Sequence, residues 1–461
     1  MWLLCAAMLP VVVQAQFTFT TNNGAITITG YTGSGGTAVI PDTTNGYPVS
    51  NIGDEAFYGC TGLTNVTIPT SVTNIGHGVF AFCGNLASIV IPDSVTNIGI
   101  CAFYSCSNLT SATIGTNVTS IAISTFDSCA SLTNVTIPNG VTNVGSSAFQ
   151  NCASLGSITI PASVISIGLY AFDSCSSLMA ITVDPLNTNY SSVDGVLISL
   201  NRTTLIQFPG GKQGNYTVPN SVAFIGDSSF DSSVNLTGIT ITNNVLNIGD
   251  FAFDGCTGLT TITMPNSITN IGCWAFDGCS GLTTVTIPNG ITFLRDHTFE
   301  DCASLTNVTI GSGVSKVGGW VFDGCTNITR FYFQGNAPYV YYASAFSNRI
   351  HAIVYYLPGT AGWGGGYWVY SPFFFEGLSF QTKLWLPQVQ TGDAYFGIKT
   401  NQFGFNINWA SGQTVVVESC TDLANPTWTP VGTNTLSGSL SYFSDSQWTN
   451  YPGRFYRLRS P

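Results

Sequence analysis

The chain has 461 residues and a formal net charge of −11; 44% of its residues are hydrophobic and only 7% are charged. This balance favours a folded chain with a large core, since disordered chains combine low hydrophobicity with high net charge. The 11 lysine and arginine residues are too few for the basic surface that binds nucleic-acid phosphates. We therefore expect no nucleic-acid partner.

The first 15 residues are similar to a secretory signal peptide. Residues 2–13 are almost all apolar, and Ala15 is a small residue suited to signal peptidase cleavage, although no basic residue precedes the apolar run. The run is too short to span a bilayer as a helix, and no later run is long enough. We expect residues 1–15 to be removed and the protein to be secreted or displayed at the cell surface. The alternative interpretation is a buried first strand.

From residue 57 the chain repeats a 23-residue pattern. Phenylalanine recurs at this spacing, cysteine follows three residues later, and leucine follows three residues after the cysteine. A period of roughly 20–50 residues is typical of solenoids, propellers and other arrays, and this period lies in the leucine-rich-repeat range. The residues at these positions should form the core, and they include Phe57, Cys60, Leu63, Phe149, Cys152, Phe276 and Cys279.

Each repeat predicts two short strands. In the segment LTNVTIP, Val66 and Ile68 alternate with polar Asn65 and Thr67, and Pro69 ends the strand. The segment SVTNIG supplies a second short extended piece, and the phenylalanine and cysteine then pack inward from a turn or short helix. A single coil leaves its top and bottom uncovered, so only stacking on neighbouring coils can bury them.

These segments resemble the BspA-type leucine-rich repeat, whose pattern is close to LTSITIPxSVTSIGxxAFxxC. The resemblance covers roughly residues 17–346. With the period, it implies a mainly β fold: a leucine-rich-repeat solenoid over residues 16–345, with a parallel sheet and about eleven to twelve coils. Members of this family are associated with adhesion to host or matrix proteins. The resemblance therefore implies a surface or secreted bacterial recognition protein, without naming a ligand.

The regular spacing breaks once, between Phe172 and Phe230, which are 58 residues apart. The additional residues form an insert at 184–219. Within it, the apolar runs GVLIS and TTLIQF stand on either side of the polar pair Asn201 and Arg202. This arrangement predicts a β-hairpin that protrudes from the solenoid.

The end of the chain differs in pattern. Residues 346–385 predict a degenerate repeat, a cap and a connector rich in glycine and aromatic residues. Over residues 386–461 the 23-residue period is absent, and alternating segments such as FGFNINW predict a small all-β, sandwich-like domain. Its final stretch, GRFYRLRSP, contains Arg454, Arg457 and Arg459, which could contact an anionic envelope component or simply be solvated in a last strand. We expect this domain to serve attachment or export.

Two repeated positions carry residues capable of chemistry. Ten cysteines occupy one of them. We expect buried free thiols and no disulfides, because a free cysteine behaves as a small buried hydrophobe and Ser233 takes the same position in one repeat. We expect no metal site, because no Cys-x-x-Cys pair occurs. Acidic residues follow the phenylalanine in several repeats; a stack of them could bind Ca²⁺, or each could accept hydrogen bonds within its own turn. The uninterrupted part of this acidic column comprises Asp231, Asp254, Asp277, Glu300 and Asp323.

Recognition is favoured over catalysis. The three histidines belong to no nucleophile motif, and no cofactor motif occurs. Outward strand positions are mainly Thr, Asn and Ser, and an extended face of this kind can bind an extracellular protein or glycan through many weak contacts. We expect a monomer without a cofactor; a carbohydrate-binding or enzyme-accessory module and a structural envelope protein are the alternatives. Candidate ligand-binding residues, where the polar pattern is interrupted or aromatic residues gather, are Arg202, Phe224, Phe293, Arg330, Tyr332, Trp363, Tyr367 and Trp368.

Overall fold

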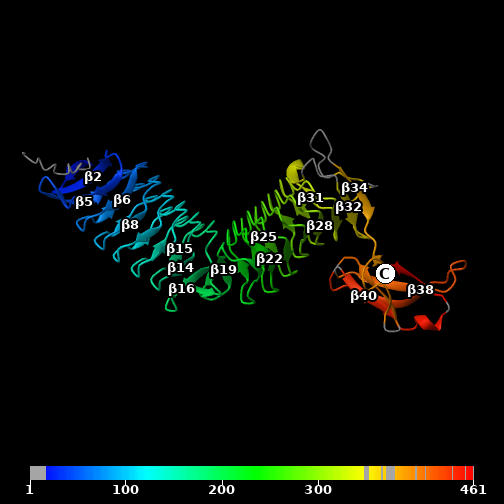
Figure 1. The fold of residues 1–461 in the computed structure, drawn as a ribbon. Helices are drawn as coiled ribbons and strands as arrows, with labels where there is room; N and C mark the ends of the chain where they lie inside the picture. The colour runs from blue at the N-terminus through cyan, green and yellow to red at the C-terminus, as the bar shows by residue number, and fades with distance from the viewer. Residues whose placement is uncertain are drawn as a thin grey trace, which may run out of the picture.

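The computed structural model describes residues 17–346, 352–364, 367–369, 379–399, 402–410, 412–438, 440–451 and 453–459. Over these residues the chain forms a solenoid of about 14 turns, followed by an all-β C-terminal domain (Figure 1). The helical elements in these ranges are two 3₁₀ turns, η1 (Ala343–Ala345) and η2 (Trp448–Asn450). The turn count exceeds the expected eleven to twelve because the terminal coils and the stacked insert lack the Phe-x-x-Cys signature.

One side of the solenoid is a ladder of parallel strands, here called the long-strand ladder. Its side chains alternate as predicted: in β6 Leu63 and Val66 are buried, whereas Asn65 and Thr67 are exposed. Equivalent residues of successive repeats are register partners, as Ser88 and Ser111 are. The ladder comprises four successive sheets, and the antiparallel β33 (Tyr367–Val369) follows β34 at its end. Its parallel strands are β3 (Gly36–Val39), β6 (Leu63–Thr67), β8 (Ser88–Val90), β10 (Ser111–Thr113) and β12 (Asn134–Val135); β14 (Ser157–Ile160) and β16 (Ala180–Val183); β20 (Gly214–Thr217), β22 (Leu236–Thr240) and β24 (Thr261–Thr263); and β26 (Thr284–Thr286), β28 (Asn307–Ile310), β30 (Arg330–Phe333), β32 (Ile353–Tyr356) and β34 (Ser379–Leu384).

A second ladder, here called the short-strand ladder, is formed by the SVTNIG segments. A glycine ends most of these strands because successive coils approach closely: a Cβ atom at Gly99 would lie 2.5 Å from the carbonyl carbon of Gly76. The strands of this ladder are β1 (Phe17–Asn22), β2 (Ala25–Tyr31), β4 (Thr43–Thr44), β5 (Tyr47–Ile52), β7 (Asn74–Ile75) and β9 (Asn97–Ile98); β11 (Ser120–Ile121), β13 (Asn143–Val144) and β15 (Ser166–Ile167); β17 (Tyr190–Val193), β18 (Val196–Ser199), β19 (Thr204–Gln207), β21 (Phe224–Ile225), β23 (Asn247–Ile248) and β25 (Asn270–Ile271); and β27 (Phe293–Leu294), β29 (Lys316–Val317) and β31 (Tyr339–Val340).

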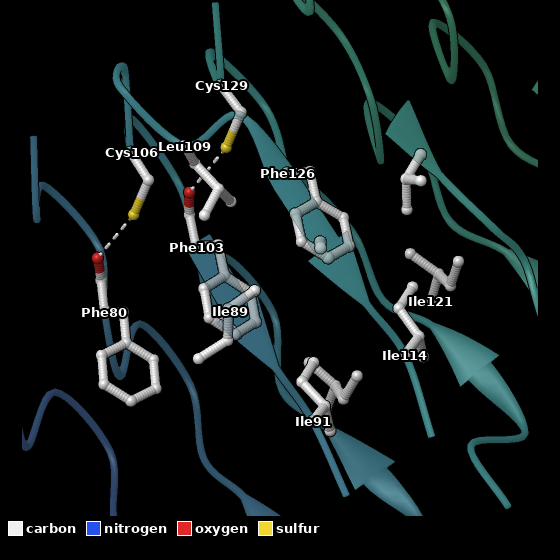
Figure 2. Packing of buried hydrophobic residues seen from close by; sticks show 14 of the residues in the cluster. Phe80, Ile89, Ile91, Phe103, Cys106, Leu109, Ile114, Ile121, Phe126 and Cys129 are labelled. Atoms are coloured by element: carbon white, nitrogen blue, oxygen red, sulfur yellow. Dashed lines mark hydrogen bonds between the residues drawn. The ribbon is translucent and has the colours of Figure 1, made fainter. Parts of the chain in front are cut away.

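The repeated phenylalanines and cysteines close each coil from turns that lie between the ladders (Figure 2). The rings of Phe103 and Phe126 stack with centroids 5.3 Å apart and planes 6° apart. The thiol of Cys129 donates a hydrogen bond to the carbonyl oxygen of Phe103, at 3.2 Å. Cysteine suits this position because it is a small apolar side chain that still carries a weak donor. Six of the seven core residues named from the sequence are fully buried, and Cys60, in the first regular coil, is half-buried: the six are Phe57, Leu63, Phe149, Cys152, Phe276 and Cys279.

The thiols give a first testable expectation. All 13 cysteines in the described ranges are free, and burial raises the pKa of Cys83 to about 12. Because the thiolate is the reactive form, iodoacetamide at pH 8 should leave the buried cysteines unmodified in the folded protein. In denaturant without reductant it should modify nearly all of them, as measured by intact mass. Unmodified cysteines in denaturant that react only after reduction would show disulfides instead.

The insert at 184–219 is part of the stack. The hairpin expected around Asn201 and Arg202 is present as β18 and β19, but its strands lie within the short-strand ladder and do not protrude. Adjacent side chains of β18 enter two different cores: Leu197 packs in the first, and Val196 in the second. A strand buried on both faces has a continuous apolar sequence, which accounts for the run GVLIS. In Figure 1, β16 and β19 lie where two arms of the solenoid meet.

The C-terminal domain consists of two antiparallel sheets around a small core. Residues Phe405, Ile407, Trp409, Val415 and Val417 are buried between the sheets. The solenoid residue Leu357 joins the same cluster, so the end of the second arm and the domain are packed together. One sheet contains β35 (Gln388–Gln390), β36 (Gly397–Lys399), β37 (Gln402–Asn408) and β40 (Leu440–Asp445), and the other contains β38 (Thr414–Cys420), β39 (Thr429–Thr435) and β41 (Phe455–Arg459).

Candidate functional site

A cleft of about 1110 Å³ lies between the long-strand ladder of the second arm and the C-terminal domain. Its solenoid wall is made by outward-facing side chains of β24, β26, β28, β30 and β32. Thr286, Thr309, Tyr332 and Tyr355 occupy the same position in successive strands and are register partners. The alternation of side chains along a strand therefore directs one repeated position of the sequence into the cleft.

Three aromatic side chains, Tyr332, Tyr355 and Trp385, lie together at the end of this wall and are here called the aromatic corner. Tyr332 stacks on Tyr355 with ring centroids 5.1 Å apart and planes 19° apart. Trp385, just beyond β34, approaches Tyr332 at 4.8 Å with a tilt of 46°. Burial is the main cause that raises the pKa of the Tyr332 hydroxyl, while the nearby Arg330 opposes the shift. The Tyr332 phenol is therefore neutral and available as a hydrogen-bond donor at physiological pH.

The opposite wall comes from the connector and the C-terminal domain. Leu386, Gln388 and Asn408 line it with exposed side chains. The indole of Trp409 is buried behind this wall, and its Nε1 donates to the carbonyl oxygen of Trp385 at 3.0 Å. This hydrogen bond ties the connector to the domain and holds the two walls in place.

The charge in the cleft is low. Among the described residues that line it, Arg330 carries the only formal charge, and the remaining polar side chains are Asn, Gln, Thr, Ser and Tyr. No carboxylate in the described ranges forms an ion pair with Arg330. The cleft can therefore offer many neutral hydrogen bonds, three aromatic rings and one guanidinium to a ligand.

The other candidate residues lie apart from the cleft. Phe224 and Phe293 are exposed on β21 and β27 of the short-strand ladder, and Arg202 is exposed at the hairpin turn. Trp363 is only 3% exposed and packs against Phe333 and Tyr356, so its role as a surface ligand residue is not supported. Tyr367 and Trp368 belong to β33, and their side chains lie outside the described residues.

A column of stacked aromatic side chains on the turns of the second arm was not predicted from the sequence. Phe251, Trp274, His297 and Trp320 stand two positions before the repeated phenylalanine, and their neighbouring rings stack with centroids 5.0, 4.4 and 4.9 Å apart. All four residues have φ between 54° and 59°, a left-handed conformation that costs a non-glycine residue roughly 1–2 kcal/mol. Inspection of this repeat position would have revealed the column, since other coils have small residues such as Ser147 there.

The acidic column does not gather into a metal site. In the part of the chain that the structure describes, no three His, Cys, Asp or Glu side chains are arranged to hold a metal ion. Ser232 Oγ donates to Asp231 Oδ1 at 3.0 Å, a side-chain hydrogen bond within the same turn. Burial, together with Asp173 and Asp254, raises the pKa of Asp231 to about 8. Burial likewise raises the pKa of Asp277 to about 6.

The three C-terminal arginines are bound within their own domain. Arg457 and Arg459 both pair with Glu418 on the neighbouring β38, at 2.7 and 3.0 Å. Arg454 pairs with Asp445, at 2.8 Å. These ion pairs support a structural role, and they argue against a free basic patch at the end of the chain.

The chain is similar to known repeat proteins in both sequence and fold. The model of the BspA type leucine-rich repeat region matches residues 46–192 and 214–352. No curated protein matches the chain. Among the described residues, none of the helical segments has the length and apolarity that a membrane-spanning helix needs.

Three solved structures show the same kind of solenoid. A leucine-rich cell surface protein from Faecalibacterium prausnitzii A2-165 is 33% identical, with a TM-score of 0.57, over 70% of this chain and 94% of that one. A leucine-rich repeat protein from Eubacterium ventriosum is 28% identical, with a TM-score of 0.59, over 71% and 85%. The pneumococcal vaccine antigen PcpA is 20% identical, with a TM-score of 0.57 over 75% and 93%, and shares the fold. The protein described here belongs to the family of BspA-type leucine-rich-repeat proteins.

Proposed function

We propose that the protein is a non-enzymatic recognition protein, secreted or held at the bacterial cell surface, that binds an extracellular ligand in the cleft. The observation that supports this function is the cleft itself. It is large, lined by neutral polar and aromatic side chains, and formed by the outward face of the repeat. Extended solenoid faces of this kind are suited to binding by many distributed contacts. The family match and the similarity to the leucine-rich cell surface protein from Faecalibacterium prausnitzii support the location.

The position of the cleft supports a role for the C-terminal domain that differs from the one expected from the sequence. From the sequence we expect the C-terminal domain to serve attachment or export, and the solenoid with its insert to bind the ligand. Because Gln388, Gln390 and Asn408 supply the opposite wall, this proposal gives the domain a share in ligand binding. Attachment to the cell surface remains compatible with the domain's other faces.

Blocking the cleft tests the function. The protein from residue 16 onward is applied to arrays of extracellular matrix proteins and glycans, beside the variant Thr286→Trp. Thr286 is exposed on β26 and lines the cleft, so an indole there should occupy space that the ligand needs. We expect roughly tenfold weaker binding or more, as for disruption of an interface centre.

The matched control is Thr67→Trp, an exposed threonine at the same repeat position in the first arm. This variant should bind as the unmodified protein does. Both variants change solvent-exposed side chains, so their thermal unfolding should stay close to that of the unmodified protein. Equal binding by Thr286→Trp and the unmodified protein would place the ligand site elsewhere on the molecule.

A further inference from the structure

We infer that the cleft takes a linear, uncharged glycan, laid along the second arm against the aromatic corner of Tyr332, Tyr355 and Trp385. This inference rests on the proposed function and names the ligand class. Both walls carry exposed side chains that offer hydroxyl or amide groups, such as Thr284 and Thr286 on one side and Gln388 and Asn408 on the other. Amides and hydroxyls both donate and accept hydrogen bonds, as sugar hydroxyls do.

The aromatic corner supplies the apolar contact that a sugar ring needs. The C–H bonds on one face of a pyranose carry partial positive charge, and the face of an aromatic ring carries partial negative charge. Trp385 is tilted by 46° from Tyr332, so the two rings do not cover each other completely. Both side chains are half-buried and line the cleft. A few aromatic surfaces among directed polar groups are typical of small-molecule and glycan sites.

The repeat makes the site periodic. Thr286, Thr309, Tyr332 and Tyr355 are equivalent residues on adjacent strands. Adjacent strands lie about 4.8 Å apart, a spacing comparable to one sugar unit of an extended chain. One glycan running across the strands would therefore meet an equivalent side chain at each unit, and several coils would share the binding.

Two alternatives fit the cleft less well. An extended peptide usually binds by adding a strand to a free sheet edge, but the ladder turns its face toward the cleft and offers side chains there. A polyanion would approach a chain of net charge −11 with Arg330 as the one cation among the described lining residues. Arg330 can instead donate several hydrogen bonds to sugar oxygens.

Calorimetric titration of the protein from residue 16 onward tests the inference. The probes are xylohexaose, cellohexaose and mannohexaose, with hexagalacturonate as the charged comparison. We expect at least one neutral hexasaccharide to bind more tightly than hexagalacturonate. Tyr332→Ala and Trp385→Ala should each weaken that binding by roughly tenfold or more, because each removes an aromatic surface that a sugar ring would contact. Tyr332→Phe keeps the ring and should retain most of the affinity.

The controls separate folding from binding. Thr286→Trp, at an exposed position, should abolish hexasaccharide binding, and Thr67→Trp should leave it unchanged. If no neutral hexasaccharide binds at millimolar concentration while Thr286→Trp prevents capture of a matrix protein, the glycan inference is overturned and the proposed function stands. Tighter binding of hexagalacturonate also overturns it. If Thr286→Trp alters the binding of no ligand on the arrays, the proposed function fails as well.

Discussion

Replacing Phe149 by alanine should lower the free energy of unfolding of the first arm by about 3–5 kcal/mol, the usual cost of truncating a buried phenylalanine. Phe149 is fully buried and stacks between Phe126 and Phe172, at 5.5 and 5.7 Å. The substitution removes both ring contacts and leaves a cavity that the stacked backbone can fill only partly, since each coil is held by its neighbours on both sides. Chemical denaturation of the purified variant measures the loss.

The damage should be confined to one arm. Each coil contacts only its neighbours, and β18 separates the first core from the second. Hydrogen exchange should show lost protection in the first arm, around β12, β14 and β16, with protection retained in β24 and in β38 of the C-terminal domain. Ser157→Ala, an exposed substitution on β14, is the control and should change stability by about 0.5 kcal/mol or less. Equal loss of protection in all three regions would mean that the whole chain unfolds as one unit.

Replacing Asp231 by asparagine should stabilise the second arm at pH 8. Burial and the neighbouring carboxylates raise the folded-state pKa of Asp231 from 3.8 to about 8. Because the folded state holds this proton more tightly than the unfolded state, stability is greatest below the unfolded pKa and is lost as the pH rises toward 8. Asparagine carries no charge at any of these pH values and can still accept the hydrogen bond from Ser232, so the loss should disappear.

Because one pKa unit corresponds to about 1.4 kcal/mol, the expected gain is at most about 5 kcal/mol at pH 8, and it is close to zero near pH 4. Thermal unfolding of both proteins from pH 4 to pH 8 measures it, and the pair at pH 4 serves as the internal control. A variant that is less stable than the unmodified protein at pH 8 would contradict the burial argument. That result would instead show that the Asp231 anion has a stabilising partner, such as a cation bound to the acidic column.

The repeated core could be predicted from the sequence because its cause lies within each repeat. Phe103, Cys106 and Leu109 recur at one spacing, each must be buried, and a 23-residue coil can bury them only by stacking. The same argument gives the outward position of Thr286 and Tyr332, since side chains alternate along a strand. It also explains the nine fully buried cysteines of the repeat, from Cys83 to Cys325. Each serves as a small apolar side chain and as a weak donor to the preceding coil.

The role of the insert was decided by tertiary structure. The hairpin follows from the turn at Asn201 and Arg202, but the apolar run of β18 is equally compatible with a protruding strand pair and a buried wall. Packing resolves the choice, because Leu197 and Val196 each meet a different core. In the same way, Trp363 has an aromatic side chain suited to a binding surface, and only its contacts with Phe333 and Tyr356 place it in the interior.

By itself the sequence determined the solenoid, the two faces of its long strands, and Arg330 and Tyr332 as interruptions of the polar pattern. Tertiary structure alone decided that these two residues lie beside Trp385 and face Gln388 and Asn408 across a cleft. The physical reason is the range of the interactions. The residues that bury the core lie within one 23-residue repeat, and the same apolar pattern recurs in each repeat of the sequence. The cleft instead depends on how Leu357 packs into the core of the C-terminal domain and on the hydrogen bond from Trp409 to Trp385. These contacts join distant segments, and no periodic pattern records them.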